Sequence, residues 1–423
     1  MMVITAVLII TPLMINFTFD SSINKLKVYN IEDRAKAKLT AESGLRFAML
    51  RLTLYQEAYN YLQNNESAKD IVKQKTLDTI WNFPFAYPIP KLPTMNLIQK
   101  DSIDDFHEET LLDGNLLLSI NNISNKINLN MLRISLILDA DKDENEEEAT
   151  EEELTFSPEV QLIKVINNAI EKESERDEAF GAEYYGLETD LLVNELKYFL
   201  SDPDSLENTG GGDENFISEE ISPKKGPLVS FSELYTLPSW PDSITNLIKS
   251  EFTVHGAIMI DLNKITDALL KLLVPDMTED DIADFFKYRN NDNDPRNFNS
   301  LEDFQNYIVN IGNVMTEEDF TKRFENFLKQ GLQFGPTPTL FKITSTASVG
   351  RSTYNLVVFV TLPAQPKPRP PAYPDESEDE KEERLVKEKA AYEKLTDEEK
   401  KKKEEEDKKT LLLKPRIVEV IIG

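Results

Sequence analysis

The sequence predicts an α+β fold, because helical and strand patterns occupy different parts of the chain instead of alternating. Residues 1–54 keep apolar residues at helical spacing, and the long middle part of the chain is rich in predicted helix. Strand-type patterns lie on both sides of that middle part, at residues 116–120, 340–349, 354–362 and 416–422. We therefore divide the chain into an N-terminal helix (1–54), a first α/β part (55–126), an inserted helical domain (127–335) and C-terminal strands (336–423).

The N-terminal helix begins with a long uncharged run, and Asp20 is its first ionisable side chain. At about 1.5 Å per residue, residues 1–19 are long enough to cross the hydrocarbon core of a bilayer. An apolar stripe then continues to Leu54 through Leu39, Gly44, Ala48 and Leu50, with charged residues on the opposite face. A cleaved secretory signal is disfavoured, because no lysine or arginine precedes the run and no A-x-A site is present. A plain membrane anchor and a type IV pilin-like helix, which is an anchor first and a filament core later, both stay open.

Composition excludes several classes of function. The net charge of -29 repels phosphate backbones, so we expect no nucleic-acid partner. Cysteine is absent, which removes disulfides, thiol catalysis and cysteine-based metal sites. His107 and His255 are the two histidines, and we interpret both as ordinary surface or partly buried residues. Phosphate-binding loops, dinucleotide-binding fingerprints, nucleophile elbows and zinc-protease motifs are also missing, so we predict that the chain is not an enzyme.

The helical domain contains an internal repeat, seen when residues 127–234 are set against residues 260–304. Ile-Asn-Leu-Asn at 127–130 matches Ile-Asp-Leu-Asn at 260–263. An aromatic helix end followed by acidic residues, and then a serine-led segment, recur in the same order in both copies. Two copies predict a pair of related helix–loop–helix units.

Two acidic segments are candidate cation sites. Residues 139–157 imitate the start of an EF-hand loop, but Glu144 stands where that loop needs glycine and Thr150 where it needs glutamate, so we interpret this run as a solvated insertion. The second segment places Asp202, Asp204, Asp213 and Glu214 around a run of three glycines, and such oxygen ligands suit calcium. The alternative there is an Asp-Pro helix stop followed by a mobile loop. A third segment, 363–414, is proline-rich and then highly charged, and we expect it to protrude or to be disordered.

Several of these motifs together resemble the minor pseudopilin K family of type II secretion systems. The resemblance rests on the start Met-Met-Val-Ile-Thr, on Ala-Glu-Ser-Gly at 41–44, on Asp202 and Asp204, on Lys-Gly-Pro-Leu-Val-Ser-Phe-Ser-Glu-Leu at 225–234, and on residues 260–263. Phe199 and Asp261 depart from the family pattern. The resemblance implies a long pilin-like helix packed on a small antiparallel sheet, with the large helical domain inserted between its early and late strands. It also implies calcium as the ion, held by Asp202, Asp204, Asp213 and Glu214.

The same resemblance implies a function and a location. The chain would be a minor pseudopilin at the tip of the pseudopilus, anchored once in the bacterial inner membrane with its other domains in the periplasm. Its partners would be the other minor pseudopilins, the major pseudopilin and the inner-membrane assembly platform, with exported substrates as a further candidate. Met1 would be the processed N-terminus, with a start codon as the alternative, and Thr5 stands where most such subunits carry glutamate. The alternative is a single-pass, membrane-anchored, calcium-binding adaptor protein.

Overall fold

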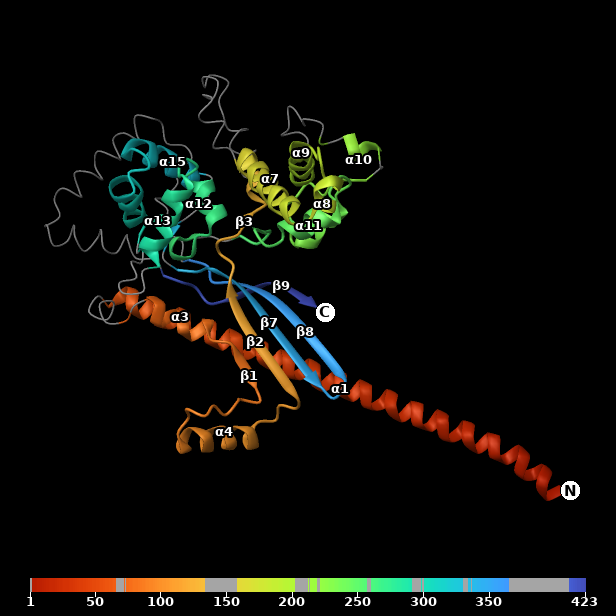
Figure 1. Ribbon diagram of the computed structural model, residues 1–423. Coiled ribbons are helices and arrows are strands. Elements are labelled where there is room, and N and C mark those ends of the chain that lie inside the picture. Colours follow the sequence, from red (N-terminus) through yellow and green to blue (C-terminus); the bar gives the residue numbers. More distant parts are fainter. Residues whose placement is uncertain are drawn as a thin grey trace, which may run out of the picture. The chain divides into compact units, whose positions relative to one another are not determined.

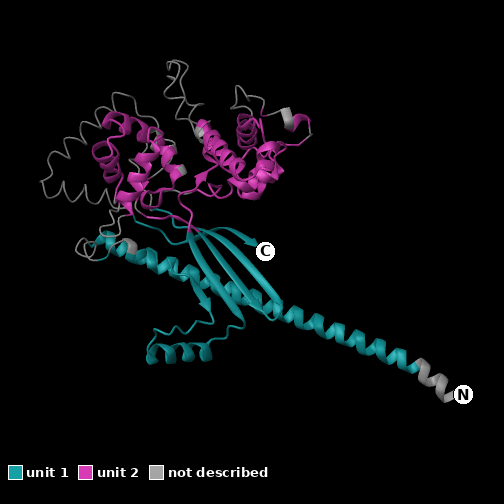
Figure 2. Cartoon of the chain, in the orientation of Figure 1, with its two compact units in different colours: residues 1–121, 342–423 teal, residues 122–341 magenta. Residues whose placement is uncertain are grey.

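The computed structural model of the chain (Figure 1) describes residues 2–65, 72, 74–133, 158–201, 212, 214–218, 221–256, 260–290, 298, 300–329, 334–335, 337–364 and 411–423. The acidic run 139–157 and most of the insertion 363–414 therefore lie outside the described residues. The chain forms two compact units: unit 1 comprises residues 1–121 and 342–423, and unit 2 comprises residues 122–341 (Figure 2).

Unit 1 contains one very long helix and most of a five-stranded sheet whose strand order is β1-β2-β7-β8-β9. Its elements are α1 (Met2–Asn64), α3 (Gln74–Asn82), β1 (Phe85–Tyr87), α4 (Leu97–Glu109), β2 (Asn115–Asn122), β7 (Leu340–Val349), β8 (Ser352–Thr361) and β9 (Arg416–Ile422). The α+β class, the long N-terminal helix and the small antiparallel sheet are confirmed. Strands β7 and β9 also begin and end where the sequence predicts them.

The two edge strands of the sheet are β1 and β9, and each runs antiparallel to its neighbour. Phe85 pairs with Leu118 and Tyr87 with Leu116 where β1 runs antiparallel to β2. At the other edge, β9 runs antiparallel to β8, with a register shift between Phe359 and Val360. The inner strands β2, β7 and β8 alternate buried and less buried side chains, as expected where one face of a sheet covers a core.

Helix α1 differs from its prediction in length, and helices α3 and α4 are additional. α1 continues to Asn64 because Tyr55, Tyr59 and Leu62 extend its buried side beyond residue 54. Closely spaced prolines at 84, 88 and 90 predict an extended connector over residues 81–90, and this segment holds the end of α3 and the short strand β1. α4 starts with a capping box between Asn96 and Gln99.

No helix in the described part of the chain carries an apolar stretch long enough to cross a membrane. The side chains of residues 1–9, about half of the run from which an anchor is predicted, are not among those described. The predicted transmembrane segment is therefore not confirmed.

Unit 2 consists of short helices in two successive halves. The first half contains β3 (Ile127–Asn128), α7 (Pro158–Arg176), α8 (Glu178–Glu183), α9 (Thr189–Leu200), α10 (Glu214–Ser218), η2 (Phe231–Thr236), α11 (Asp242–Ile248) and β4 (Phe252–Thr253). The second half contains β5 (Ile260–Asp261), η3 (Leu262–Lys264), α12 (Asp267–Leu273), α13 (Glu279–Arg289), α14 (Leu301–Asn306), η4 (Tyr307–Ile311), α15 (Glu317–Lys329) and β6 (Phe334–Gly335).

Each half is closed by a parallel pair of two-residue strands. Ile127 pairs with Phe252 in the first half, and Ile260 pairs with Phe334 in the second. The two repeat copies therefore extend beyond the sequence match, which ends at residues 234 and 304, to a returning strand in each. Buried side chains of both halves, from Leu129 to Phe327, form one continuous hydrophobic cluster.

The entry and exit of unit 2 are joined at Ser124, which is fully buried. Its Oγ accepts hydrogen bonds from the backbone N–H groups of Thr339 and Leu340, both at 2.8 Å. The N–H of Ile123 donates to the Leu340 carbonyl oxygen at 2.9 Å. These bonds satisfy buried backbone groups at the point where the chain enters and leaves the helical unit.

Candidate functional site

One face of α1 is buried within unit 1, and small residues dominate the first half of that face. The buried positions recur every three or four residues, as a helix face requires. They are Ala37, Thr40, Ala41, Gly44, Ala48, Arg51, Leu52, Tyr55, Tyr59 and Leu62. Small side chains let a strand approach the helix closely, and the larger ones fill the space farther along.

α1 approaches β2 and β7 closely at Gly44. Ser345 of β7 is fully buried, and its Oγ donates a hydrogen bond to the Ala41 carbonyl oxygen at 2.9 Å. A Cβ atom at position 44 would lie 2.9 Å from Leu116 Cδ1 and closer still to Ser345 Oγ. The local packing therefore requires glycine at position 44.

The same helix is held at the loop that precedes β2. Lys36 Nζ lies 3.2 Å from an Asp113 carboxylate oxygen, and Thr40 Oγ1 donates to the Asp113 carbonyl oxygen at 3.3 Å. Gly114 follows with φ of 77°, and a Cβ there would overlap the Ser348 carbonyl oxygen. A left-handed backbone and a close neighbour together explain glycine at this position.

The opposite side of α1 presents several large, partly exposed apolar residues, which alternate with exposed charged residues such as Arg46 and Glu57. Leu39, Leu50, Leu54 and Tyr61 are 62%, 54%, 49% and 63% exposed. The predicted apolar stripe is therefore only partly correct: its Gly44 and Ala48 lie on the buried side, whereas its leucines point away from the sheet. Exposed leucines opposite an already buried face form a candidate interaction surface.

The N-terminal part of α1 extends beyond the sheet and is exposed on all sides (Figure 1). At a rise of about 1.5 Å per residue, the 63-residue helix is roughly 95 Å long. Its large exposed apolar residues in this part are Ile10, Leu13, Met14, Ile15, Phe17, Phe19, Leu26, Val28, Tyr29 and Ile31. We name these residues together with Leu39, Leu50, Leu54 and Tyr61 the outer helix surface.

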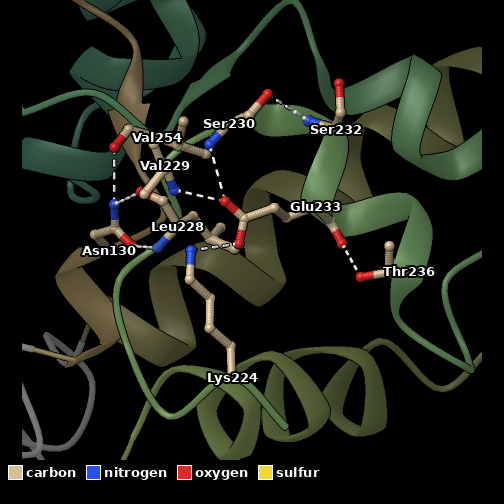
Figure 3. A network of polar contacts seen from close by, with 9 residues as sticks. All are labelled: Asn130, Lys224, Leu228, Val229, Ser230, Ser232, Glu233, Thr236 and Val254. Atoms are coloured by element: carbon tan, nitrogen blue, oxygen red, sulfur yellow. Dashed lines mark hydrogen bonds and ion pairs between the residues drawn. The ribbon is translucent and has the colours of Figure 1, made fainter. Parts of the chain in front are cut away.

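In unit 2, Asn130 joins three segments that are distant in the sequence (Figure 3). Its Oδ1 accepts a hydrogen bond from the N–H of Leu228 at 2.7 Å. Its Nδ2 donates to the carbonyl oxygens of Leu228 at 3.0 Å and of Val254 at 2.7 Å. Leu228 and Val254 are buried, so these bonds satisfy backbone groups that water does not reach.

Glu233 organises the adjoining serine-led segment, as Figure 3 shows. Its Oε1 accepts from the N–H groups of Val229 and Ser230 at 2.8 and 3.1 Å, and its Oε2 lies 2.6 Å from Lys224 Nζ. Burial by itself raises the pKa of this carboxyl group, but the bonds from Lys224, Val229 and Ser230 outweigh it, and the pKa is lowered below its ordinary value. The resemblance to pseudopilin K rests partly on this segment, and its local role here is to fix a backbone turn.

The lowered pKa of Glu233 predicts a pH-dependent contribution to stability. The contribution is complete above the unfolded-state pKa and is lost as pH falls through the lower folded-state pKa. We expect Glu233→Gln to destabilise unit 2 by about 1–3 kcal/mol at neutral pH, with the difference from wild type shrinking in acid. Urea unfolding followed by Trp240 fluorescence, in a Trp81→Phe background, measures this. Glu171→Gln, at an exposed position on α7, is the matched control, and an equal loss in both variants would contradict the assignment.

The second half of unit 2 repeats the asparagine arrangement. Asn263 Oδ1 accepts from the N–H of Phe298 at 2.7 Å, and Asn263 Nδ2 donates to the Phe298 carbonyl oxygen at 2.9 Å. Leu228 and Phe298 each stand two residues before a serine, Ser230 or Ser300, that caps the following helix. The motif match between residues 127–130 and 260–263 therefore corresponds to one structural device used twice.

The residues predicted to bind calcium are not placed by the structure. Asp202, Asp204 and Asp213 lie outside the described residues, and Glu214 begins α10 with its side chain undescribed. Among the described residues, no group of three or more histidine, aspartate or glutamate side chains could hold a metal ion. Met1 and the side chain of Thr5 are likewise outside the described part.

The two histidines have structural contacts. His107 Nε2 accepts a hydrogen bond from the N–H of Ile89 at 3.0 Å, and its ring packs edge-on against Tyr87. His255 is buried, and its N–H donates to Thr253 Oγ1 at 3.2 Å. These contacts agree with the interpretation of both as ordinary residues.

No protein-family model matches the sequence, and no curated protein matches it either. Among solved structures, the fold is similar to a chain of the GspK-GspI-GspJ complex from the enterotoxigenic Escherichia coli Type 2 Secretion System. The two chains share 14% sequence identity with a TM-score of 0.47, and the match covers 79% of this chain and 94% of that chain.

Sequence reasoning missed the two asparagines and Ser345 as organising residues. Asn130 and Asn263 were visible as the last residue of each matching tetrapeptide, but their partners lie 98 and 35 residues farther along the chain. For Ser345 the available signal was a serine at a buried position of an alternating strand, where an unpaired hydroxyl is costly.

Proposed function

We propose that the chain is a structural subunit of a type II secretion pseudopilus, of the minor pseudopilin kind. The observation that carries the proposal is the outer helix surface: α1 buries one face on its own sheet and leaves large apolar residues exposed on the other side and along its N-terminal part. Such a helix is suited to bundling with equivalent helices of other subunits. The proposed role is assembly, and it calls for no catalytic group.

The proposal places the chain at the tip of the filament. Residues 1–19 contain no carboxylate, so this subunit cannot pair a buried acidic side chain with the N-terminal amine of a neighbour. A buried unpaired charge is very costly, and a terminal subunit avoids the requirement. The large helical unit, inserted in the chain between β2 and β7, would also hinder repetition along a closely wound shaft.

The partners we propose are the other minor pseudopilins, followed by the major pseudopilin and the inner-membrane assembly platform. Before assembly, residues 1–19 would lie in the inner membrane and the two compact units in the periplasm. This part of the proposal is supported by the uncharged N-terminal run and the sequence motifs, and it extends the argument from the outer helix surface.

Charge on the outer helix surface tests the proposed function. We expect the pair Leu50→Asp and Leu54→Asp to reduce co-purification with the other minor pseudopilins at least tenfold, because two apolar side chains lose burial and two charges enter the interface. The measurement is pull-down of the tagged full chain, co-expressed with the minor pseudopilins of its own genome. Leu111→Asp is the matched control, since Leu111 is 99% exposed and lies outside α1.

The pull-down separates interface loss from unfolding. Leu50, Leu54 and Leu111 are exposed, so the double variant and the Leu111→Asp control should both retain the thermal unfolding profile of the wild type. Co-purification at the wild-type level by the folded double variant would reject the outer helix surface as the assembly interface.

We further propose that the loop from Asp202 to Glu214 binds calcium. Support comes from the carboxylates around the glycine run and from Gly212, which is buried against the backbone of Asn194 and Glu195 in α9. We expect millimolar calcium to raise the melting temperature of the wild type, because an ion bound only by the folded state stabilises it. Replacing Asp202 and Asp204 with alanine should remove that increase.

A matched pair of substitutions locates the calcium effect. Asp141→Ala and Asp143→Ala change the other acidic run, which we interpret as a solvated insertion, and should leave the increase intact. If the wild type shows no increase, or if both pairs of substitutions abolish it equally, the loop is not the calcium site.

A further inference from the structure

The second half of unit 2 contains a cavity of about 390 Å³ beside α13 and η4. Its polar lining consists of Asp281, Asp284, Lys287, Tyr288 and Tyr307. None of its lining residues belongs to the outer helix surface or to the predicted calcium loop, and no function described above uses it.

Tyr307 gives the cavity an unfilled hydrogen-bonding group. The residue is 4% exposed and lines the cavity, yet its hydroxyl forms no hydrogen bond with any described residue. Burial, followed by the charges of Asp284 and Asp281, raises the pKa of this phenol to about 12. At neutral pH the hydroxyl is therefore protonated, close to two carboxylates, and able to accept a hydrogen bond from a ligand.

The carboxylates of Asp281 and Asp284 differ in the number of hydrogen bonds that they accept. Asp281 accepts from the Thr278 N–H at 2.9 Å and from Thr278 Oγ1 at 2.7 Å through one oxygen, Oδ2. Asp284 accepts no hydrogen bond and forms no ion pair with a described residue. Lys287 is the single cationic residue in the lining, so the cavity retains an excess negative charge.

The remaining walls are apolar and aromatic. Met277, Ile311 and Val314 provide aliphatic surface, and the ring of Tyr288 lies 4.6 Å from the ring of Tyr307 between centroids. An aliphatic wall next to aromatic rings and carboxylates matches a side chain with an apolar stem and a cationic end.

The geometry points to a binding site for a lysine side chain of a partner protein in this cavity. The stem contacts Met277, Ile311 and Val314, and the ammonium group donates to the Asp284 carboxylate and the Tyr307 hydroxyl. The ammonium donates to the Tyr307 hydroxyl where it opens into the cavity, and it neutralises the excess charge of the cavity. The site does not depend on the proposed function in secretion.

A pair of blocked pentapeptides tests the site on the full-length protein. One carries lysine between glycines, and the other carries norleucine, which keeps the stem and lacks the charge. We expect saturable binding of the lysine peptide by calorimetry or NMR and at least tenfold weaker binding of the norleucine peptide. Asp284→Asn and Tyr307→Phe should each weaken lysine binding by about tenfold or more.

Asp280→Asn is the matched control, since Asp280 is exposed in the first turn of α13 and does not line the cavity. It should bind the lysine peptide as the wild type does. Should Tyr307→Phe fail to fold, Asp284→Asn decides the matter, because Asp284 is exposed and its removal leaves the core intact.

Three results would overturn the inference. Equal binding of both peptides would show that the charge is not recognised, and unchanged binding by Asp284→Asn would place the lysine elsewhere. Saturable binding of the free diamine cadaverine without binding of the lysine peptide would identify a small-amine site and reject a protein partner.

Discussion

Gly44→Val is expected to abolish stable packing of α1 on the sheet of unit 1, and Gly44→Ala to weaken it. Alanine favours a helix over glycine by about 1 kcal/mol, so the substitution would stabilise an exposed helix position. Here the added Cβ would meet Ser345 Oγ and Leu116 Cδ1 inside a packed interface, and overpacking of this kind typically costs about 1–3 kcal/mol, or more for valine. We therefore expect a net loss for alanine and a larger one for valine.

The two tryptophans allow each unit to be followed separately. Trp81 in unit 1 is buried and packs edge-on against Tyr55 of α1, with 6.4 Å between ring centroids, whereas Trp240 lies in unit 2. Urea unfolding in a Trp240→Phe background therefore reports on α1 packing through Trp81. Gly256→Ala, with no atom near the added Cβ, is the control for the change of residue type.

A double-mutant cycle with Ser345→Ala tests the cause of the loss. Ser345→Ala alone removes the bond to the Ala41 carbonyl oxygen, but it also removes the atom that the new Cβ would meet. The double variant Gly44→Ala with Ser345→Ala should therefore be more stable than the sum of the two single losses predicts. Strict additivity, or an alanine variant as stable as the wild type, would show that the helix and sheet do not approach closely at this point.

Elements with a strongly periodic local sequence could be predicted from the sequence alone. β7 alternates buried and partly exposed side chains over its whole length, so its strand period was visible. The apolar residues of α9 likewise recur at helical spacing up to Leu200, so its helical period is visible in the sequence. α3 and α4 were missed because they lie on either side of the closely spaced prolines at 84–93, which favour an extended interpretation of this region.

The buried face of α1 was predicted only in part, for a physical reason. Periodicity analysis gives weight to large apolar residues, and in α1 those between Leu39 and Leu54 face outward. The residues that face the sheet there are mostly small, because close approach of helix and strands leaves no room for larger ones. The side of α1 with small residues therefore packs on the sheet, and the side with large exposed residues is available to a partner.

The sequence motifs of the candidate site could be recognised, but the arrangement of their side chains in the fold could not be predicted. The tetrapeptides at 127–130 and 260–263 were recognised as equivalent, yet each asparagine acts on backbone groups that only the folded chain brings near it. Glu233 similarly lay in a recognised motif, while its lowered pKa depends on Lys224 and two backbone N–H groups in the folded turn.

Asn130→Ala is expected to cause the second large loss of stability. Removing the side chain leaves the Leu228 N–H and the carbonyl oxygens of Leu228 and Val254 without these partners in a buried region. Each unsatisfied buried backbone group costs about 1–3 kcal/mol, so we expect a total loss of roughly 3–5 kcal/mol after partial relaxation. The measurement is urea unfolding of unit 2 through Trp240 fluorescence in a Trp81→Phe background.

The equivalent residue of the second half provides an internal comparison. Asn263→Ala removes two hydrogen bonds to the Phe298 backbone, whereas Asn130→Ala removes three, so Asn263→Ala should destabilise unit 2 by a smaller amount. Asn310→Ala is the control, because Asn310 is exposed and its side chain bonds to Asn306 one turn away.

Since both halves share one hydrophobic cluster, either asparagine variant should unfold unit 2 in a single transition. Two separate transitions in Asn130→Ala would instead show that the halves fold independently, and a loss no greater than that of Asn310→Ala would show that the shared asparagine does not hold each repeat together.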